Sequence, residues 1–373
     1  PSETKGMTGA VIGTRTVINA VSQATKVSVV EVLHRKIRLA GAQISWRAGL
    51  QYIKDYKASR QTLMDALDGQ GTSPFVLYLC VASSLVGGLR DAATMRYVRR
   101  RFPHCHFALH TRNGDFFFPK SAFLKSLRRW QLSQAYRMIC LSHRLLPSAQ
   151  DLLHILPQEA HSRIRVVPNT IDADLIASPE ELAVKAGKTG PITVLYLSNF
   201  IPSKGYLKLG EAIQIIAKAG RLQEFRFVFR GTWPNQSLFE EFEASFSPDI
   251  LASGAVDIGH GIWDREAVRA ALLEADVFCL PTSYPAEAQP RSILEGMACG
   301  CSILANDHAS IADLVESGET GFIAKDISPQ DMADFLMAQS RTDIAEQGQR
   351  GRVKFDEQFS RAAHDESIRE AIL

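Results

Sequence analysis

Two glutamates eight residues apart form the most chemically specific pattern in this chain of 373 residues. Glu287 and Glu295 lie in the segment SYPAEAQPRSILEGMACG (283–300), directly after an apolar run that is typical of a buried strand. Glu287 falls in a loop between two prolines, and Glu295 falls one turn into a predicted helix. We expect both carboxylates to face the sheet edge where strands end, which is where doubly wound sheets bind ligands.

Each of these glutamates also has a purely structural interpretation. Ser292 is a candidate N-cap of the predicted helix, and Glu295, three residues later, would complete a capping box. Glu287 would then be an ordinary carboxylate in a surface loop.

Three other segments place polar residues or glycines after predicted strands. In SNFIPSKGY (198–206) a strand end is followed by Lys204 at the start of a helix, where free amides and partial positive charge suit a diphosphate. A loop lysine can equally be a solvated charge. Gly231, in FRGTW, would let a ligand approach the backbone or would serve only as a turn residue. His308 follows another strand and is expected to be a satisfied surface histidine.

Apolar runs alternate with amphipathic helical segments along the chain, which predicts α/β domains with parallel sheets covered by helices on both faces. The expected strands are 26–33, 74–83, 106–111, 137–142, 163–169, 192–198, 225–231, 276–282 and 301–307, and the clearest helices are 206–220 and 265–275. At about 150 residues per domain, the length suits two domains.

The domain boundaries follow from shifts in composition. We expect a first domain over 1–172, a polar, glycine- and alanine-rich linker over 173–190, and a second domain over 191–355. Residues 356–373 are expected to form a helix that returns to the first domain. The chain starts in a glycine-containing loop with no strand before it, so the first strand is expected to be missing or atypical.

Composition excludes several classes of protein. A net charge of +2 argues against a nucleic-acid-binding polycation, and no apolar run reaches the length of about 20 residues that a membrane span needs. No signal peptide is visible. The six cysteines form no CxxC pair, and Cys80, Cys140 and Cys279 fall in apolar runs, so we expect buried, reduced thiols and a cytoplasmic location.

The segments VVPNTID, SNFIPSKGY, ADVFCLPTSYPAEAQPRSILEGMACGCSILAND and ESGETGFI together resemble glycosyltransferase family 4. The resemblance covers most of the chain from Arg137 onward, in the family's order and spacing. It implies the GT-B fold, in which two Rossmann-like domains face each other across a cleft. It also implies retaining transfer of a hexose-type sugar from a UDP- or GDP-sugar to a glycan or polyprenyl-linked acceptor, in surface polysaccharide or glycolipid assembly. No metal or other cofactor is implied.

The resemblance implies roles for individual residues of the second domain. Glu287 would lie against the donor sugar, Glu295 would accept hydrogen bonds from the ribose, and Lys204 would neutralise the departing diphosphate. Asn199 stands where the family usually has an arginine, so Arg291 or another basic residue would have to supply that charge. The other residues expected to bind the donor are Gly231, Gln289, Ser292 and Ile293.

In the first domain the resemblance points to a histidine and a glycine. His110 would face the donor sugar, and Gly6 would belong to a loop that closes over the sugar and phosphates. The alternatives are a histidine that caps a strand and a simple turn into a helix.

Residues 90–129 form a basic segment, with ten lysines and arginines against Asp91 and Asp115. Phe116, Phe117, Phe118 and Phe123 are interleaved with these charges. This pattern suits a peripheral contact with an anionic membrane, at the inner face of the cell membrane. A nucleic-acid patch is disfavoured because no recognised fold for one is present. A solvated basic helix with phenylalanines in the core is the remaining interpretation.

Other functions on the same fold stay open. A catalytically silent nucleotide-sugar-binding or scaffold protein would keep Glu295 and Lys204, and a GT-B sugar-nucleotide epimerase is a second alternative. A nicotinamide dehydrogenase is disfavoured because the chain has no GxGxxG between a strand and a helix, and an α/β hydrolase because it has no GxSxG.

Overall fold

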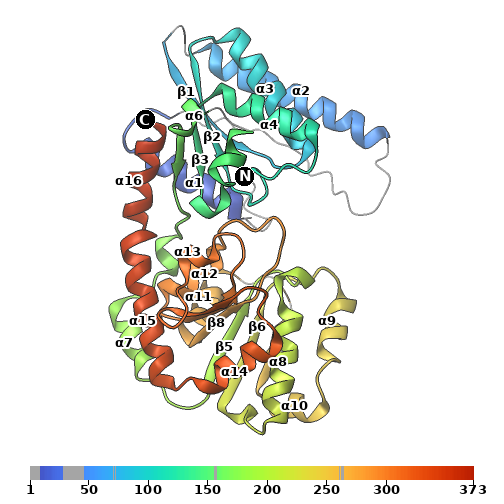
Figure 1. Ribbon diagram of the computed structural model, residues 1–373, viewed down its shortest axis with the longest axis vertical. Helices are drawn as coiled ribbons and strands as arrows, with labels where there is room; N and C mark the ends of the chain where they lie inside the picture. The colour runs from blue at the N-terminus through green and yellow to red at the C-terminus, as the bar shows by residue number, and fades with distance from the viewer. Residues whose placement is uncertain are drawn as a thin grey trace. The chain divides into compact units, whose positions relative to one another are not determined.

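The computed structural model describes residues 9–27, 46–69, 71, 73–154, 158–259, 261 and 264–373. These residues divide into two compact units. The N-terminal unit consists of Pro1–Cys140, Leu146–Val167 and Ser367–Leu373, and the C-terminal unit of Leu141–Leu145 and Pro168–Glu366. Each unit is built on a parallel sheet with helices packed against it (Figure 1). Gly6 and most of the strand expected at 26–33 lie outside the described residues.

The N-terminal unit contains a four-stranded parallel sheet in the order β1-β2-β3-β4. The strands are β1 (Phe75–Val81), β2 (Cys105–Thr111), β3 (Ala135–Cys140) and β4 (Ile164–Val166). The helices are α1 (Gly9–Ser22), α2 (Trp46–Asp68), α3 (Leu85–Arg101), α4 (Ala122–Gln134), α5 (Ala149–Leu153), α6 (Gln158–His161) and the last turns of α16 (Arg361–Ile372).

Alternation along β2 shows how this sheet is covered on both faces. Phe107 and Leu109 pack in one apolar cluster with residues of α2, α3 and α4. Ala108, between them, points to the other face and packs with α1 and with Ile368 and Ala371 of α16. The C-terminal end of the chain thus completes the core of the N-terminal unit.

One expectation about the thiols is wrong. Cys140 and Cys279 are buried as predicted, but Cys80 is exposed. Cys80 lies in β1, which pairs only with β2 among the described strands, and most residues of β1 are only partly covered. An apolar run therefore marked the strand correctly but not the burial of each of its residues.

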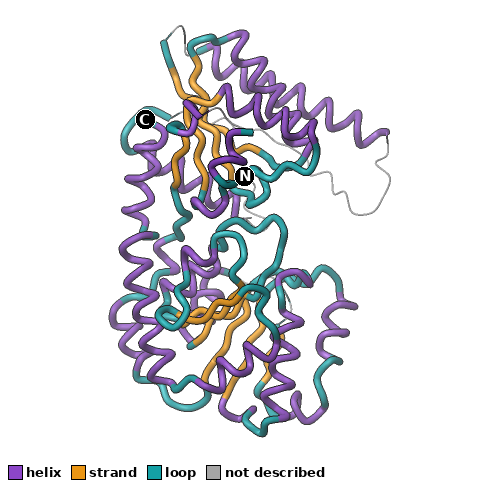
Figure 2. Tube along the Cα trace, in the orientation of Figure 1, coloured by secondary structure: helices purple, strands orange, loops and turns teal. Residues whose placement is uncertain are grey.

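The C-terminal unit contains a six-stranded parallel sheet in the order β10-β9-β8-β5-β6-β7. The strands are β5 (Ile192–Leu197), β6 (Phe225–Arg230), β7 (Val256–Ile258), β8 (Val277–Leu280), β9 (Ser302–Asn306) and β10 (Gly321–Ala324). The helices are α7 (Pro179–Ala186), α8 (Tyr206–Lys218), α9 (Gln236–Glu243), α10 (Pro248–Ala252), α11 (Arg265–Glu274), α12 (Arg291–Ala298), α13 (Ile311–Leu314), α14 (Pro329–Ala338), α15 (Arg341–Gln358) and the start of α16. Figure 2 shows the strands of this sheet, in orange, enclosed by helices.

The strand order of the C-terminal unit creates a topological switch point between β5 and β8. From β5 the chain proceeds outward to β6 and β7, then returns to β8 on the other side of β5 and continues to β9 and β10. The connections after β5 and β8 therefore lead to opposite halves of the sheet from neighbouring strand ends. Open α/β sheets bind ligands at such a point.

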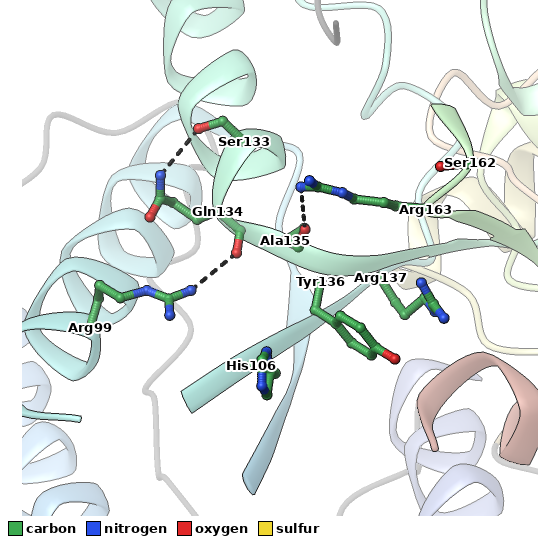
Figure 3. A pocket seen from close by; sticks show the side chains of 9 residues that line it. All are labelled: Arg99, His106, Ser133, Gln134, Ala135, Tyr136, Arg137, Ser162 and Arg163. Atoms are coloured by element: carbon green, nitrogen blue, oxygen red, sulfur yellow. Dashed lines mark hydrogen bonds between the residues drawn. The ribbon is translucent and has the colours of Figure 1, made fainter. Parts of the chain in front are cut away.

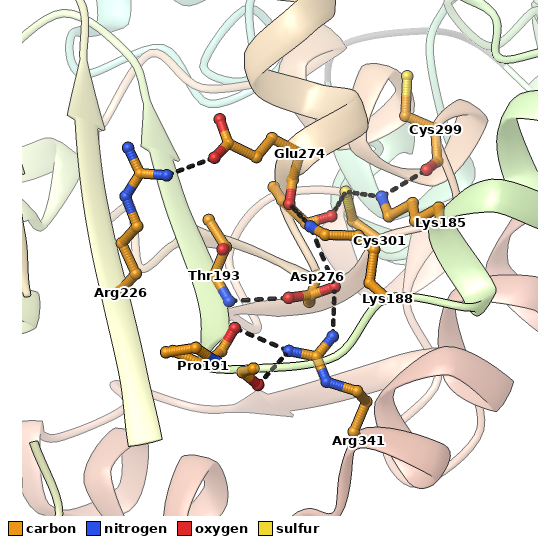
Figure 4. A network of polar contacts seen from close by, with 12 residues as sticks. Lys185, Lys188, Pro191, Thr193, Arg226, Glu274, Asp276, Cys299, Cys301 and Arg341 are labelled. Carbon is orange, nitrogen blue, oxygen red and sulfur yellow. Dashed lines mark hydrogen bonds and ion pairs between the residues drawn. The ribbon is translucent and has the colours of Figure 1, made fainter. Parts of the chain in front are cut away.

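A network of charges ties the strand starts together at the opposite edge of this sheet (Figure 4). The buried carboxylate of Asp276 accepts hydrogen bonds from the amide of Thr193 at 2.8 Å and from Arg341 at 3.1 Å. Lys185 donates to the carbonyl of Cys299 at 2.6 Å. These bonds join the starts of β5 and β8 to α15, and the end of α12 to α7, so they give the sheet a fixed base.

The segment expected as a linker, 173–190, contains a helix. The hydroxyl of Ser178 accepts a hydrogen bond from the amide of Glu181, whose carboxylate accepts one from the amide of Ser178, and this capping box starts α7 at Pro179. The two compact units instead divide between Val167 and Pro168, with residues 141–145 also in the C-terminal unit.

Candidate active site

The loops after β5 and β8 are locked together at the switch point. Gly205 ends the first loop with a φ of +86°, and a Cβ atom there would overlap the carbonyl oxygen of Pro281 in the second loop. The amide of Ser283 donates to the carbonyl of Ser203 at 2.7 Å. The two loops therefore hold their side chains in fixed positions relative to each other.

This packing brings two of the predicted site residues into direct contact. Lys204 Nζ lies 2.5 Å from Glu287 Oε2, and the two side chains are only 15% and 12% exposed. The same ammonium group lies 4.9 Å from the centre of the Tyr284 ring, within cation–π range. The sequence placed both residues at strand ends, and the structure pairs them.

The loop that carries Glu287 is held on both sides by hydrogen bonds to its backbone. Ser310 Oγ donates to the carbonyl of Ala288 at 2.7 Å. His308 Nε2 lies 2.8 Å from the carbonyl of Tyr284, and because a carbonyl only accepts, this nitrogen carries the hydrogen. His308 is thus satisfied by a chain contact, as predicted.

Gln289 anchors the same loop to the segment that enters the C-terminal unit. Its Oε1 accepts a hydrogen bond from the amide of Asn169 at 2.6 Å, and Asn169 Nδ2 donates to the carbonyl of Gln289 at 3.0 Å. Gln289 Nε2 lies 3.5 Å from the carbonyl of Leu141. Gln289 and Asn169 are both buried. The side-chain amide of Gln289 therefore positions the loop, and its contact with a donor stays a prediction.

Helix α12 begins two residues earlier than the capping interpretation requires. Its N-cap is Pro290 and its first residue is Arg291, so Ser292 already lies in the first turn and cannot cap the helix. The capping box between Ser292 and Glu295 is therefore wrong. The side chain of Ile293 is fully buried in the core, so only its backbone amide remains for a ligand.

The two helices that follow the switch-point strands differ from most other helices of this unit at their first turns. Side-chain N-caps close α7, α9, α11, α14 and α15, at Ser178, Asn235, Asp264, Ser328 and Ser340. By contrast, α8 follows Gly205 and α12 follows Pro290, and neither cap residue offers a side-chain hydrogen bond. Amides at an uncapped N-terminus beside a strand end suit an anion such as a phosphate.

Glu295 lies half-buried on α12, four residues after Arg291. Burial raises the pKa of its carboxyl group, and the positive charges of Arg291 and Arg265 oppose that rise. Within the described part of the chain, its side chain makes no hydrogen bond. Its carboxylate can therefore accept hydrogen bonds from a ligand, and a ligand with several donors would offset the cost of burying this charge.

Two further candidates lie in the loops after β5 and β6. Asn199 is exposed, and its carbonyl lies 3.4 Å from the hydroxyl of Tyr196. Gly231 has a φ of +146°, and a Cβ atom there would overlap the carbonyl oxygen of Ser198. Gly231 is thus required for the close approach of two neighbouring loops, which is its structural interpretation.

His110, in the N-terminal unit, is buried near the end of β2. Its Nδ1 lies 2.7 Å from the hydroxyl of Tyr78, and the two rings meet edge to face. Burial raises the pKa of Tyr78 well above its usual value, so this hydroxyl keeps its proton. The imidazole is therefore part of a buried polar cluster in its own unit.

The basic segment 90–129 contains both core and surface residues. Phe116 and Phe117 are buried, and the buried guanidinium of Arg128 donates to the carbonyl of Ser83 at 2.7 Å. Phe118 and Phe123 are 50% and 60% exposed. In the described parts of the chain, no helix is both long and apolar enough to span a membrane.

Comparison with solved structures defines the fold. A sucrose-phosphate synthase from Thermosynechococcus elongatus superposes with a TM-score of 0.67 at 15% identity, over 97% of this chain and 92% of that one. HepE of Anabaena, solved in complex with UDP and glucose, gives a TM-score of 0.63 at 16% identity, over 88% and 82%. With its two parallel-sheet units, the chain has the GT-B fold.

Sequence comparison identifies related proteins. Residues 178–342 match the family model described as "Glycosyl transferases group 1". The "Amylovoran biosynthesis glycosyltransferase AmsK" of Erwinia amylovora is 24% identical over 178 residues, which are 46% of this chain and 42% of the relative. The chain therefore spans less than half the length of this curated relative.

Proposed function

We propose that this protein is a retaining glycosyltransferase of family 4 that transfers a hexose from a nucleotide sugar, bound at the switch point of the C-terminal unit. The observation that carries the proposal is the group of residues around the Lys204–Glu287 pair. A cation, a carboxylate and the uncapped amides of α12 converge where β5 and β8 end. Glu295 adds an unsatisfied acceptor on the same helix.

The chemistry of glycosyl transfer matches these charges. When the bond between sugar and phosphate breaks, positive charge develops at the anomeric carbon and negative charge on the leaving diphosphate. Lys204 and the helix amides would stabilise the diphosphate, and Glu287 would stabilise the sugar ring. In this arrangement Lys204 exchanges part of its contact with Glu287 for a phosphate oxygen. Glu295 would hold the ribose.

The comparisons favour a particular donor and acceptor. HepE, with the same fold, was solved with UDP and glucose, so we propose a UDP-sugar as donor. The relative from Erwinia amylovora acts in amylovoran biosynthesis, so we propose a growing glycan, free or polyprenyl-linked, as acceptor. His110 remains a candidate for contact with the sugar.

An exposed apolar and basic face on the N-terminal unit supports membrane contact on the cytoplasmic side. Phe118 and Phe123 are exposed near the start of α4, next to exposed Lys120 and Lys125. Apolar side chains flanked by cations suit an anionic lipid surface. Sedimentation with phosphatidylglycerol vesicles should fall for Phe123→Ser but not for Val184→Ser, which alters an even more exposed apolar residue of the C-terminal unit. Equal sedimentation of both variants would contradict this contact.

A transfer assay tests the proposed function. Wild-type protein is incubated with UDP-, GDP- or ADP-sugars and a panel of glycan acceptors, and the new linkage is assigned by NMR. We expect transfer from a UDP-sugar, with the donor's anomeric configuration retained. An inverted product would remove the retaining mechanism, and donor binding without turnover would indicate the silent binding protein. Interconversion of the donor sugar itself would indicate an epimerase.

A further inference from the structure

A candidate binding site lies in the N-terminal unit, at the end of its sheet opposite His110. It is a pocket of about 540 Å³ at the edge where β2, β3 and β4 begin (Figure 3). Its lining residues are Arg99, His106, Ser133, Gln134, Ala135, Tyr136, Arg137, Ser162 and Arg163. His106 and His110 stand four residues apart on β2, which is about 13 Å along a strand, so the pocket is separate from His110.

Three arginines meet in this pocket without a carboxylate. None of the lining residues is acidic, and Arg99, Arg137 and Arg163 form no ion pair with any described residue. In the C-terminal unit, by contrast, Arg265 and Arg341 pair directly with aspartates. Gathering like charges raises the local positive potential, and a bound anion would relieve it.

Part of this arrangement has a structural explanation. Arg99 Nη2 lies 3.4 Å from the carbonyl of Gln134, and Arg163 Nη1 lies 3.2 Å from the carbonyl of Ala135. These are the last carbonyls of α4 and of its C-cap, which basic side chains commonly satisfy. The two contacts also fix both guanidinium groups beside the pocket, as Figure 3 shows.

Capping does not explain Arg137. Its guanidinium lies over the ring of Tyr136, at 4.3 Å from the ring centre, and donates no hydrogen bond to the described chain. His106 packs against the same ring at 5.2 Å between centres, and neither the imidazole nor the Tyr136 hydroxyl has a hydrogen-bond partner among the described residues. The tyrosine thus orients a guanidinium whose donors remain available to a ligand.

We propose that this pocket binds an anionic saccharide, whose carboxylate or phosphate group is held by Arg137 and Arg163. The guanidinium forks match the geometry of such oxyanions. The volume falls in the range of small-molecule sites, and Ser133 and Gln134 offer polar groups to sugar hydroxyls. A concave pocket fits a discrete charged group better than a flat lipid surface. The proposal does not depend on the roles assigned at the switch point.

Calorimetry with defined probes tests this site. Tetragalacturonate supplies an acidic oligosaccharide, maltotetraose its neutral counterpart, and inorganic phosphate the bare oxyanion. We expect saturable binding of tetragalacturonate at one site, competition by phosphate, and no binding of maltotetraose. Arg137→Gln/Arg163→Gln should weaken tetragalacturonate binding by roughly tenfold or more, as expected for lost hydrogen bonds to a charged group.

Controls separate this site from general charge effects and from the donor site. Arg100→Gln removes an exposed arginine of α3 that does not line the pocket, and it should leave binding unchanged. Arg137→Gln alone breaks no hydrogen bond to the described chain, so it serves if the double variant fails to fold. We expect UDP to bind wild type and both pocket variants with the same affinity. If UDP bound none of these proteins, that result would argue against the donor site but not against the pocket.

Several outcomes would overturn the pocket proposal. One is that tetragalacturonate does not bind saturably. Another is that Arg100→Gln weakens tetragalacturonate binding as much as the pocket variants do. Binding of phosphatidylglycerol vesicles that the pocket variants lose, without any binding of tetragalacturonate, would assign the pocket to a lipid headgroup instead.

Discussion

Lys204 Nζ and Glu287 Oε2 lie 2.5 Å apart, although 83 residues separate them along the chain. The contact exists because β5 and β8 are neighbours in the sheet, and because Gly205 allows their loops to touch. Each charge keeps the other satisfied in a largely buried setting. A phosphate bound at the proposed diphosphate site would therefore share a cation that Glu287 also contacts.

The two glutamates should fail in different ways when substituted. Glu287→Ala should lower turnover by roughly a hundredfold or more, because its charge is proposed to act as positive charge develops on the sugar. Glu295→Ala should mainly raise the KM for the donor, since ribose contacts are equal in the ground and transition states. Steady-state kinetics with the preferred donor checks both. Near-normal turnover of Glu287→Ala would reduce this residue to a loop carboxylate.

Glu295 should lower the stability of the ligand-free protein at neutral pH. Burial raises its folded pKa above the unfolded value of about 4.3, so the folded state holds the proton more tightly. Stability is then lost as the pH rises from about 4 through the folded pKa.

Glu295→Gln should remove the loss of folding stability that the buried carboxyl group causes at neutral pH. We expect the variant to melt at a higher temperature than wild type at pH 7, with the difference shrinking towards pH 4, while it binds the donor more weakly. Thermal unfolding across this pH range measures the first effect, and calorimetry with the donor measures the second. A variant less stable than wild type at pH 7 would contradict the pKa argument.

Gly205 should be needed for packing as well as for its backbone conformation. Gly254 is a matched control, because it has a φ of +71° but open space where a Cβ atom would go. Gly254→Ala should lose about 1–2 kcal/mol of unfolding free energy from the left-handed conformation alone. Gly205→Ala should lose more, and should lower activity, because the new Cβ atom meets Pro281. Urea denaturation compares the two, and equal losses would show that the loop contact is not required.

Gln289 should act on turnover through the position of the Glu287 loop. Gln289→Ala removes two hydrogen-bond contacts and leaves the buried amide of Asn169 without its acceptor, which should cost about 1–3 kcal/mol of stability. We also expect kcat to fall, because the loop loses its anchor. Gln214→Ala is the control, since it removes one bond to the carbonyl of Ser245, away from the switch point. If both variants keep wild-type kcat, the anchor is purely structural.

The sheet around the candidate site could be predicted from sequence because its central strands are apolar runs. Residues 192–198 and 276–282 were expected as strands, and they contain β5 and β8. The strands β7 and β10 were not predicted: the sequence VDI of β7 is interrupted by an aspartate, and the sequence GFIA of β10 begins with a glycine, which usually marks a turn.

The features of the site that the sequence did not reveal depend on tertiary contacts. Ser292 looked like an N-cap, but the chain enters α12 at Arg291, after Pro290. The role of Gln289 depends on Asn169, 120 residues earlier, so no local pattern could reveal it. The helix α7 did have a local signal, the run Ser178–Glu181, whose serine and glutamate spacing is that of a capping box.

Binding of nucleotide sugars to Lys204→Met tests the central claim most directly. The control is Lys218→Met, at the far end of the same helix α8, about 18 Å from its start. UDP-glucose, GDP-mannose and ADP-glucose are each titrated calorimetrically into wild type and both variants. We predict that at least one binds wild type with a stoichiometry of one, that Lys204→Met weakens it roughly tenfold or more, and that Lys218→Met does not. Equal affinity in all three proteins would contradict a diphosphate site at the switch point.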